Sequence, residues 1–485
     1  MEPIHILLII LGYFMLLILI SWITGKSDDD NKTFFLGNRQ SPWFVVAFGM
    51  IGTTLSGVTF ISVPGWVADS QFSYMQMVMG YLLGYFVIAT VLMPLYYRLN
   101  LTSIYSYLDQ RFGFWSYKTG AFFFLLSRTI GAAFRLYLVA NVLQLTVFDA
   151  WHVPFSVTVI ATILLIWLYT FRSGIKTIIW TDTLQTFFIL LAVGITIWLI
   201  SDEMNLGLKG LYDTLRDSEY SQIVFFGDWS DTKHFVKQFL AGAFIAIVMT
   251  GLDQDMMQKN LSCKNIGEAQ KNMFWFSIAL VFVNLFFLSL GVLLYQFAAL
   301  KGITATGDNL YPIIAMQGGL GIAVGLFFIL GLIAAAYSSA DSALTALTTS
   351  FSVDFLNIDQ KDEQQQVKLR QWVHVSFSVI LVLVILIFKL INDDSVISAL
   401  FKAAGYTYGP LLGLYAFGLF TKWQVRDKWV PIIALVSPLI CYIFNLNAEE
   451  WLGFQLGFEL LILNGLLTFI GLLMVIKNRN YKDCI

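Results

Sequence analysis

The residues best suited to bind an ion are three serines and one aspartate that lie together in an apolar stretch. Ser338, Ser339 and Ser342 stand beside Asp341. In a helix the three serines share one face, because residues three and four positions apart are neighbours. A hard monovalent cation prefers such oxygen ligands, and a carboxylate in an apolar segment needs a partner. Serines bonded to their own helix are the alternative, but that interpretation leaves Asp341 unexplained.

Residues 49–65 form a second apolar stretch that carries polar side chains. It combines several glycines, five hydroxyl residues and Pro64. The proline removes one backbone donor of a helix, and the glycines weaken the turns around it. An unwound helix offers carbonyl oxygens to a cation and hydroxyl groups to a solute. Alternatively, the small residues only allow this helix to pack closely against another.

Basic side chains inside apolar stretches point to bound anions. Arg128 and Arg135 lie seven positions apart and therefore share a helix face. Buried guanidinium groups need anions, which are either carboxylate side chains or a bound solute. Lys402 is a third such cation, and its alternative role is a salt bridge to an aspartate. Because Lys402 competes for the few aspartates, we expect at least one arginine to remain for a bound anion.

Three further aspartates border apolar stretches. Asp182 opens one of them and is a candidate functional residue, and the alternative is a helix-end carboxylate that faces the cytosol. Asp253 and Asp255 close another stretch beside a basic segment, and they are interpreted as gate or loop residues.

Membrane-spanning helices must position these side chains. The chain has 485 residues, of which 58% are hydrophobic and 12% are charged. Its apolar runs of roughly 20 residues are long enough to cross ~30 Å of hydrocarbon. The alternating strands that a barrel requires are missing from the pattern. We predict an all-α integral membrane protein with about thirteen transmembrane helices, at residues 4–24, 43–67, 75–97, 117–146, 153–171, 178–201, 235–255, 273–299, 318–350, 370–391, 394–421, 428–446 and 453–476.

Basic residues orient the predicted helices, because cytoplasmic loops collect Lys and Arg. Of the 29 basic residues, 20 lie in one set of alternate loops, among them Lys259, Lys264 and Lys271. Six lie in the opposite loops and helix ends, and three lie inside predicted helices. We therefore predict a multi-pass protein of the cell (inner) membrane, with its N-terminus outside and its C-terminus in the cytoplasm.

Other function classes find little support in the sequence. No basic run suggests nucleic acid, and the three cysteines are too scattered for a disulfide framework. No serine–histidine pair or carboxylate cluster with metal spacing indicates an enzyme, and no cofactor is expected. A channel is usually a symmetric oligomer with a short repeated pore motif. We therefore favour a transporter that acts as a monomer within the lipid bilayer. A transporter-like sensor that moves no solute remains an alternative.

Four segments resemble motifs of the sodium:solute symporter family, in the same order along nearly the whole chain. They are a glycine-rich turn at Arg172-Ser173-Gly174-Ile175-Lys176 that leads into Trp180-Thr181-Asp182 and Gln185, the segment 253–262 with Asp253-Gln254 and Gln258-Lys259, the helix segment Ala335-Ala336-Tyr337-Ser338-Ser339, and Gly409-Pro410-Leu411-Leu412-Gly413-Leu414. The second segment is similar to the family's Asp-Gln-x-x-x-Gln-Arg signature.

The resemblance implies a LeuT-type fold with a 5+5 inverted repeat, in which helices 43–67 and 235–255 are broken. One transmembrane domain, 1–485, would then hold an extra first helix and loop (1–41), the repeat core (42–421) and two further helices with a tail (422–485). The implied sodium ligands are the carbonyls of Gly52, Leu55 and Ala335 and the hydroxyls of Ser338 and Ser339. A second cation site would use Asp182, Asp341 and Ser342, where the family often has serine in place of Asp341. The additional carboxylate of Asp341 could make the site bind a cation more strongly. Alternatively, a proton or the side chain of Lys402 could take the place of the ion.

The resemblance also bears on the substrate, because residues 53–64 are similar to those of the family's bacterial sialic acid symporters. The implied function is sodium-coupled import of a small organic solute by alternating access. An organic anion such as sialic acid leads, and a neutral sugar, a monocarboxylate, an inorganic anion or a vitamin stays open. In those relatives an arginine binds the carboxylate, and its position here falls near Gly131, close to both intramembrane arginines. The predicted substrate-binding residues are Thr54, Ser56, Thr59, Tyr74, Arg128 and Arg135.

Overall fold

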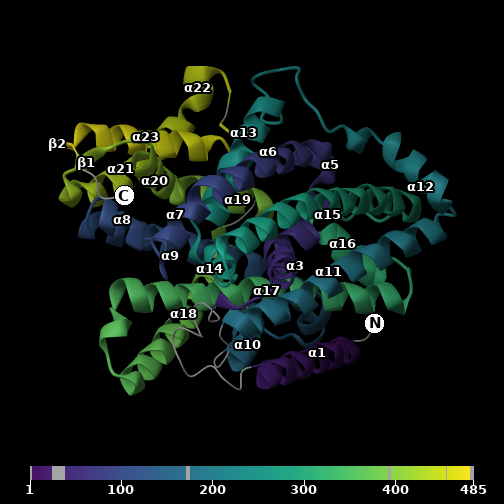
Figure 1. Ribbon diagram of the computed structural model, residues 1–485. Helices are drawn as coiled ribbons and strands as arrows, with labels where there is room; N and C mark the ends of the chain where they lie inside the picture. Colours follow the sequence, from purple (N-terminus) through teal and green to yellow (C-terminus); the bar gives the residue numbers. More distant parts are fainter. Residues whose placement is uncertain (1–2, 25–38, 171–174, 392–394, 455, 481–485) are drawn as a thin grey trace.

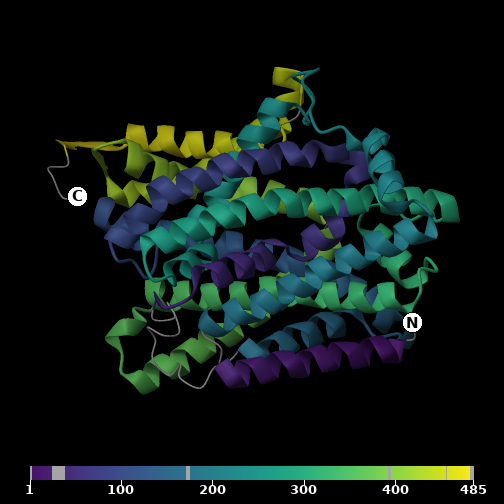
Figure 2. The same ribbon diagram turned by 45° about the vertical axis from the view of Figure 1, so that its right-hand side comes forward.

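The computed structural model describes residues 3–24, 39–170, 175–391, 395–454 and 456–480, which are almost entirely helical. Figure 1 and Figure 2 show the long helices stacked side by side along one common direction. Helix α1 (Pro3–Thr24) begins at one end of this bundle, and strand β2 (Ile476–Asn480) lies at the other (Figure 2). The all-helical class is confirmed, with one small addition: β1 (Trp423–Val425) pairs antiparallel with β2.

The helices follow the apolar runs of the sequence, because a helix satisfies its backbone hydrogen bonds internally. The other long helices are α6 (Tyr74–Val87), α9 (Phe114–Leu143), α10 (Phe155–Thr170), α11 (Ile175–Glu203), α15 (Ile266–Lys301), α17 (Ile322–Ser350), α18 (Glu363–Ile391), α21 (Val430–Leu446) and α23 (Leu460–Met474). The shorter helices are α3 (Trp43–Thr54), α4 (Val63–Gly65), α5 (Val67–Ser70), α7 (Met93–Arg98), α8 (Ser106–Arg111), α12 (Gly207–Arg216), α13 (Phe235–Ala246), α14 (Gln254–Leu261), α16 (Leu310–Gln317), α19 (Val396–Thr407), α20 (Gly409–Phe420) and α22 (Ala448–Leu452). Single π-helical turns continue several of them at Val58–Ser62, Ile88–Leu92, Gln144–Phe148, Ile247–Gly251 and Phe351–Phe355.

Seven described helices are long and apolar enough to cross a membrane, and the number rises to nine if each of two bent pairs is one span. Four shorter apolar helices lie at four further predicted spans: Ile4–Ile20, Phe155–Trp167, Gly409–Phe420 and Leu460–Met474. A helical membrane protein that crosses the bilayer many times is thus confirmed, whereas the number thirteen and the division into one domain stay predictions.

Both helices that were predicted to be broken are bent. α3 meets the helical segment Val58–Gly65 at 63°, and Leu55 between them leaves helical geometry (φ −76°, ψ 71°). The segment Phe235–Gly251 meets α14 at 65°. α14 runs to Leu261, beyond the predicted span end at residue 255. The second bend therefore lies inside the protein, with a complete helix after it, rather than at the edge of a loop.

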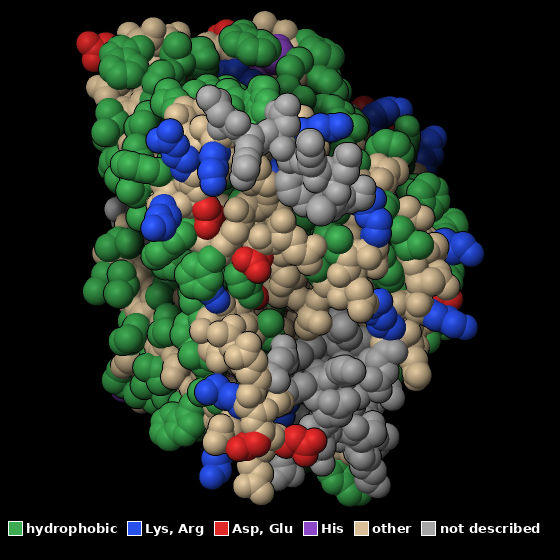
Figure 3. Space-filling view, turned by 60° about the vertical axis from the view of Figure 1, so that its left-hand side comes forward, with side chains coloured by type: hydrophobic (Ala, Val, Ile, Leu, Met, Phe, Trp, Pro, Cys, Tyr) green, Lys and Arg blue, Asp and Glu red, His purple; other side chains and the backbone are tan. Residues whose placement is uncertain are grey.

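One end of the bundle carries many basic side chains. Figure 3 faces the side that lies on the left in Figure 1, and Lys and Arg side chains are spread over it among hydrophobic ones. This distribution is what a cytoplasmic end requires, and its assignment to the cytoplasm stays a prediction. Some residues that entered the orientation argument or the glycine-rich turn lie outside the described residues: Lys26, Lys32, Arg172, Ser173, Gly174 and Lys482.

Candidate functional site

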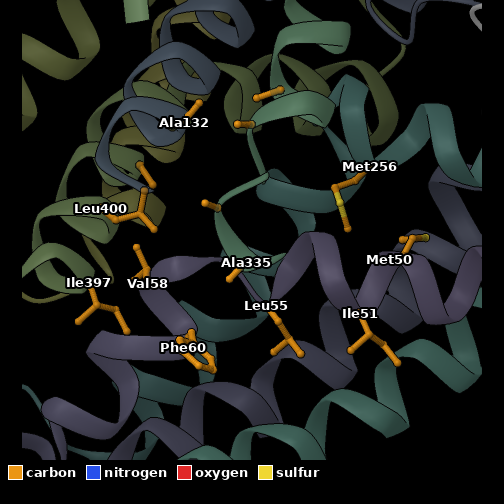
Figure 4. Packing of buried hydrophobic residues seen from close by; sticks show 14 of the residues in the cluster. Met50, Ile51, Leu55, Val58, Phe60, Ala132, Met256, Ala335, Ile397 and Leu400 are labelled. Atoms are coloured by element: carbon orange, nitrogen blue, oxygen red, sulfur yellow. The ribbon is translucent and has the colours of Figure 1, made fainter. Parts of the chain in front are cut away.

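The predicted sodium site uses carbonyl groups at the C-terminal end of α3, where the chain leaves helical geometry before the segment Val58–Gly65. The last carbonyls of a helix have no donor from a following turn, and Gly52 and Leu55 lie at this end of α3. Gly52 also lets α3 approach α11 closely, because a Cβ there would lie 2.2 Å from Thr186 Oγ1. α3 also packs against α17. Figure 4 shows Leu55 and Val58 at the break, with Ala335 of α17 nearby.

The two serines of the predicted sodium site lie on α17 and are fully buried. Ser338 Oγ donates a hydrogen bond to Asp182 Oδ1 at 2.6 Å. Ser339 Oγ has no hydrogen-bond partner among the described residues. Buried hydroxyl groups without a partner are costly, and a bound cation would give this oxygen one. The residues present therefore fit a sodium ion held by carbonyl and hydroxyl oxygens.

Asp182 lies within α11 and is completely buried, so it does not face the cytosol from a helix end. Its Oδ1 accepts the bond from Ser338, and Gln185 donates to the same oxygen at 3.1 Å when its amide nitrogen faces Asp182. Its Oδ2 accepts from Thr53 Oγ1 at 3.0 Å and from Lys259 Nζ at 2.6 Å. Two oxygens with four donors satisfy this carboxylate without any bound ion.

The sequence predicts Lys259 in a loop, but the residue lies inside the protein. It was counted among the loop lysines, but it is buried on α14 with 1% of its side chain exposed. Its Nζ also donates to Ser342 Oγ at 2.7 Å and to Thr53 Oγ1. Two signals could have found it: it follows Asp255 by four residues on a helix, and it fills the basic position of the Asp-Gln-x-x-x-Gln-Arg signature.

The structure brings two of the three predicted ligands of the second cation site to one point, since Asp182 and Ser342 both accept from Lys259 Nζ. Asp341 is also fully buried, and its Oδ1 accepts a hydrogen bond from the Ser342 backbone nitrogen at 2.6 Å. Whether these residues bind a second sodium ion stays a prediction.

Arg128 is bound to carboxylates of α14 and of the bend before it. It forms an ion pair with Asp255, and its Nη1 lies 3.9 Å from Asp253 Oδ2. Asp253 Oδ2 also accepts a hydrogen bond from Tyr408 Oη at 2.7 Å. All four residues are buried. The two aspartates are therefore buried partners of an intramembrane arginine rather than loop residues, and their interpretation as gate residues stays a prediction.

Arg135 lies seven residues, or about two helical turns, beyond Arg128 on α9 and differs from it in its partners. Within the described part of the chain, no carboxylate lies within 4 Å of it, and its buried Nε has no hydrogen-bond partner. Both arginines line a cavity at the break of α3, with about 780 Å³ of space between protein atoms, including the part open to solvent.

The same cavity gathers every residue that was predicted to bind the substrate. Its lining includes Thr54, Ser56, Thr59, Tyr74, Arg128 and Arg135. The Tyr74 hydroxyl lies 3.2 Å from that of Tyr81, which also lines the cavity. Gly131 faces a smaller space between the two arginines and α19. The structure thus places these residues around one space, and their role in binding stays a prediction.

Two further expectations concern cations. Lys402 is exposed on the surface of α19, and its position inside the membrane stays a prediction. For metal ions other than sodium, the described residues contain no group of three or more His, Cys, Asp or Glu side chains that could bind one.

Sequence comparison identifies the group of proteins to which this chain is similar. The family model described as "Sodium:solute symporter family" matches residues 34–426. The sodium/sialic acid symporter NanT of Aliivibrio fischeri is 26% identical over 431 residues, which are 86% of this chain and 82% of that protein. SiaT of Proteus mirabilis is 24% identical over 85% of this chain and 84% of its own length. A sodium-coupled monocarboxylate transporter 2 of Danio rerio is 24% identical over 89% of this chain and 68% of its own length.

Solved structures show the same arrangement of helices. A substrate-bound, outward-open Na⁺-coupled sialic acid symporter superposes with a TM-score of 0.82 at 20% identity, covering 98% of this chain and 99% of that one. Mhp1, a nucleobase-cation-symport-1 family transporter, gives a TM-score of 0.55 at 14% identity, over 90% and 92% of the two chains. The chain therefore has the LeuT-type transporter fold. With most of its length matched by the family model, it belongs to the sodium:solute symporter family and is a sodium-coupled membrane transporter rather than an enzyme.

Proposed function

We propose that this symporter imports a small organic anion by alternating access and that Arg135 binds the anion's carboxylate. The observation that carries this proposal is the contrast between the two arginines. Arg128 is held by Asp255 and Asp253, whereas Arg135 lies beside the cavity without a carboxylate partner among the described residues. A guanidinium group can take a carboxylate through two parallel hydrogen bonds.

Sialic acid is the leading candidate for the anion. It is the solute named for the relatives NanT and SiaT, and it carries one carboxylate. The hydroxyls of Thr54, Ser56 and Thr59 line the same cavity and could bond to a polyol chain. The monocarboxylate transporters are also relatives, so a smaller carboxylate is the natural second solute to test.

Sodium would bind where α3 is broken. The proposed ligands are the carbonyls of Gly52, Leu55 and Ala335 and the hydroxyls of Ser338 and Ser339. The unpartnered Ser339 oxygen supports this assignment. The ion would stabilise the unwound end of α3 beside the cavity, so that sodium and solute favour the same conformation.

The two bent segments also support the inverted repeat, because discontinuous helices at corresponding positions of two halves are typical of such transporters. Import would follow from an N-terminus outside, a C-terminus in the cytoplasm and an inward sodium gradient. We propose that a monomer performs the whole cycle.

The proposal is tested by uptake into proteoliposomes that contain the purified protein. The panel holds sialic acid, lactate, glucose and iodide, each measured with an inward sodium gradient and with choline instead. We expect sodium-dependent uptake of one of the two carboxylates. Uptake of glucose alone, or of iodide alone, would show that the carboxylate assignment of Arg135 is wrong.

Substitution of Arg135 separates the roles of the two arginines. Arg135→Lys keeps the charge but cannot form two parallel bonds, so we expect the KM for the solute to rise at least tenfold, while the sodium affinity measured without solute stays unchanged. Arg98→Lys is the matched control, because Arg98 is exposed at the end of α7. Equal KM values for Arg135→Lys and the control would contradict the proposal.

A further inference from the structure

The Lys259 ammonium group lies at the centre of the Asp182 cluster. Its Nζ donates to Asp182 Oδ2 at 2.6 Å, to Ser342 Oγ at 2.7 Å and to Thr53 Oγ1. A protonated lysine has three donors, and these three acceptors use all of them. Each of the four side chains is at most 2% exposed. The ammonium group therefore has the environment of a bound monovalent cation, with oxygen ligands on three different helices.

We infer that Lys259 permanently occupies the second cation position formed by Asp182 and Ser342, so that this protein binds a single sodium ion. The inference rests on the proposed function, because it counts the sodium ions of the proposed symporter. A sodium ion between Asp182 and Ser342 would need the oxygens that now bind the ammonium group. The other oxygen of Asp182 is already taken by Ser338. Two positive charges a few ångströms apart would also repel strongly in a buried site.

A second carboxylate holds Lys259 in place. Its Nζ lies 3.9 Å from Asp255 Oδ1, and Asp255 is the ion-pair partner of Arg128. Positive and negative groups thus alternate from Arg128 through Asp255 and Lys259 to Asp182. Withdrawal of the lysine would leave two buried carboxylates without part of their compensation, which is strongly unfavourable. Sodium therefore gains no access to Asp182 while the network is intact.

The network nevertheless touches the proposed sodium site. Ser338 is a proposed ligand of that site and also donates to Asp182, the carboxylate that holds Lys259. The first sodium ion and the lysine thus occupy neighbouring positions that are linked through Ser338 and Asp182. Removing the lysine should open a second sodium position while the first is preserved.

The number of bound ions can be measured without knowing the solute. Equilibrium binding of ²²Na⁺ to the purified protein in detergent should give one ion per wild-type molecule. Lys259→Met should bind two ions, because Asp182 and Ser342 are freed. Lys259→Arg should bind one, because it keeps the charge. Lys264→Met is the control, since Lys264 is an exposed lysine five residues away, and it should bind one.

Three results would overturn the inference. Two ions in the wild type would mean that sodium displaces the lysine, as the predicted site at Asp182, Asp341 and Ser342 requires. One ion in Lys259→Met would mean that the lysine does not exclude sodium. No ion in the wild type would overturn both the inference and the proposed sodium site, whereas the first two results leave the proposed function standing.

Lys259→Met could also be too unstable for binding measurements, because Asp182 loses its partner. Its thermal unfolding is then followed against sodium concentration, with choline as the control salt. A ligand that binds only the folded state raises its stability. Sodium should raise the melting temperature of Lys259→Met more than that of the wild type. An equal or smaller rise would overturn the inference.

Discussion

The contact of Gly52 with α11 allows a sharp test of the sodium site. In Gly52→Ala, the new Cβ would lie 2.2 Å from Thr186 Oγ1 and 2.9 Å from the Asp182 carbonyl oxygen. An ordinary contact begins at 3.4 Å, so α3 and α11 must separate locally by about 1.2 Å unless Thr186 changes its rotamer. The Thr186 hydroxyl lies 2.9 Å from the Phe48 carbonyl oxygen and 2.7 Å from that of Asp182, and its one proton bonds to either. A change of rotamer would lose this bond and is therefore costly.

The shift would carry the Gly52 carbonyl away from the sodium position. Overpacking of this kind costs about 1–3 kcal/mol. Because the ion needs the carbonyl in its original position, sodium binding must work against this cost, and every ~1.4 kcal/mol is tenfold in affinity. We expect the sodium concentration for half-maximal ²²Na⁺ binding to rise roughly 5- to 150-fold. Gly12→Ala on α1 is the matched control, because a Cβ there meets nothing within 4 Å.

A double variant checks the mechanism of the effect. Thr186→Ala removes the oxygen at 2.2 Å but leaves the Asp182 carbonyl oxygen at 2.9 Å. Gly52→Ala with Thr186→Ala should therefore recover part of the sodium affinity, and the coupling between the two changes should be measurable. Sodium affinity of Gly52→Ala within twofold of Gly12→Ala, or no recovery in the double variant, would refute the reasoning.

Three further predictions concern buried side chains of the site. Ser339→Ala removes a proposed ligand and should raise the sodium requirement of uptake at least tenfold at normal expression; an unchanged requirement would exclude this oxygen from the site. Arg128→Met leaves Asp255 without its ion-pair partner and should lower the free energy of unfolding by about 3–5 kcal/mol, measured by thermal unfolding, whereas a stability equal to wild type would mean that the pair contributes nothing. Tyr408→Phe removes the hydrogen bond to Asp253 and should cost about 1–3 kcal/mol in the same assay, with no effect on the sodium requirement.

Much of the fold was predictable because its signals are local. Apolar runs mark the helices, and Gly52 and Gly57 lie on either side of the break that the structure places after α3, whereas Pro64 lies inside the helical segment beyond the break. The shared helix face of Ser338, Ser339 and Ser342 also follows from their spacing in the sequence alone. Helical periodicity requires no knowledge of the neighbouring helices, so such features survive whatever the tertiary packing turns out to be.

The electrostatic partners could not be predicted in the same way. Lys259 and Asp182 lie 77 positions apart, and Arg128 and Asp255 lie 127 apart. No spacing rule connects such residues, and the count of loop charges treats every lysine near a span end as hydrated. The packing of α14 against α3 and α17 decides that Lys259 is buried. The pairing of Arg128, which leaves Arg135 for the cavity, depends on the same packing.

The ion pair between Lys259 and Asp182 limits the accumulation ratio that the protein can reach for its solute. One sodium ion moving with one monovalent anion carries no net charge, so the membrane voltage would do no work on the cycle. A tenfold sodium gradient would then support only about tenfold accumulation. A second ion would square that ratio and add about 2.3 kcal/mol per 100 mV, or roughly fiftyfold more. With a fixed positive charge in place of the second ion, the transporter would lose this additional accumulation. Its uptake would, however, continue unchanged when the membrane is depolarised.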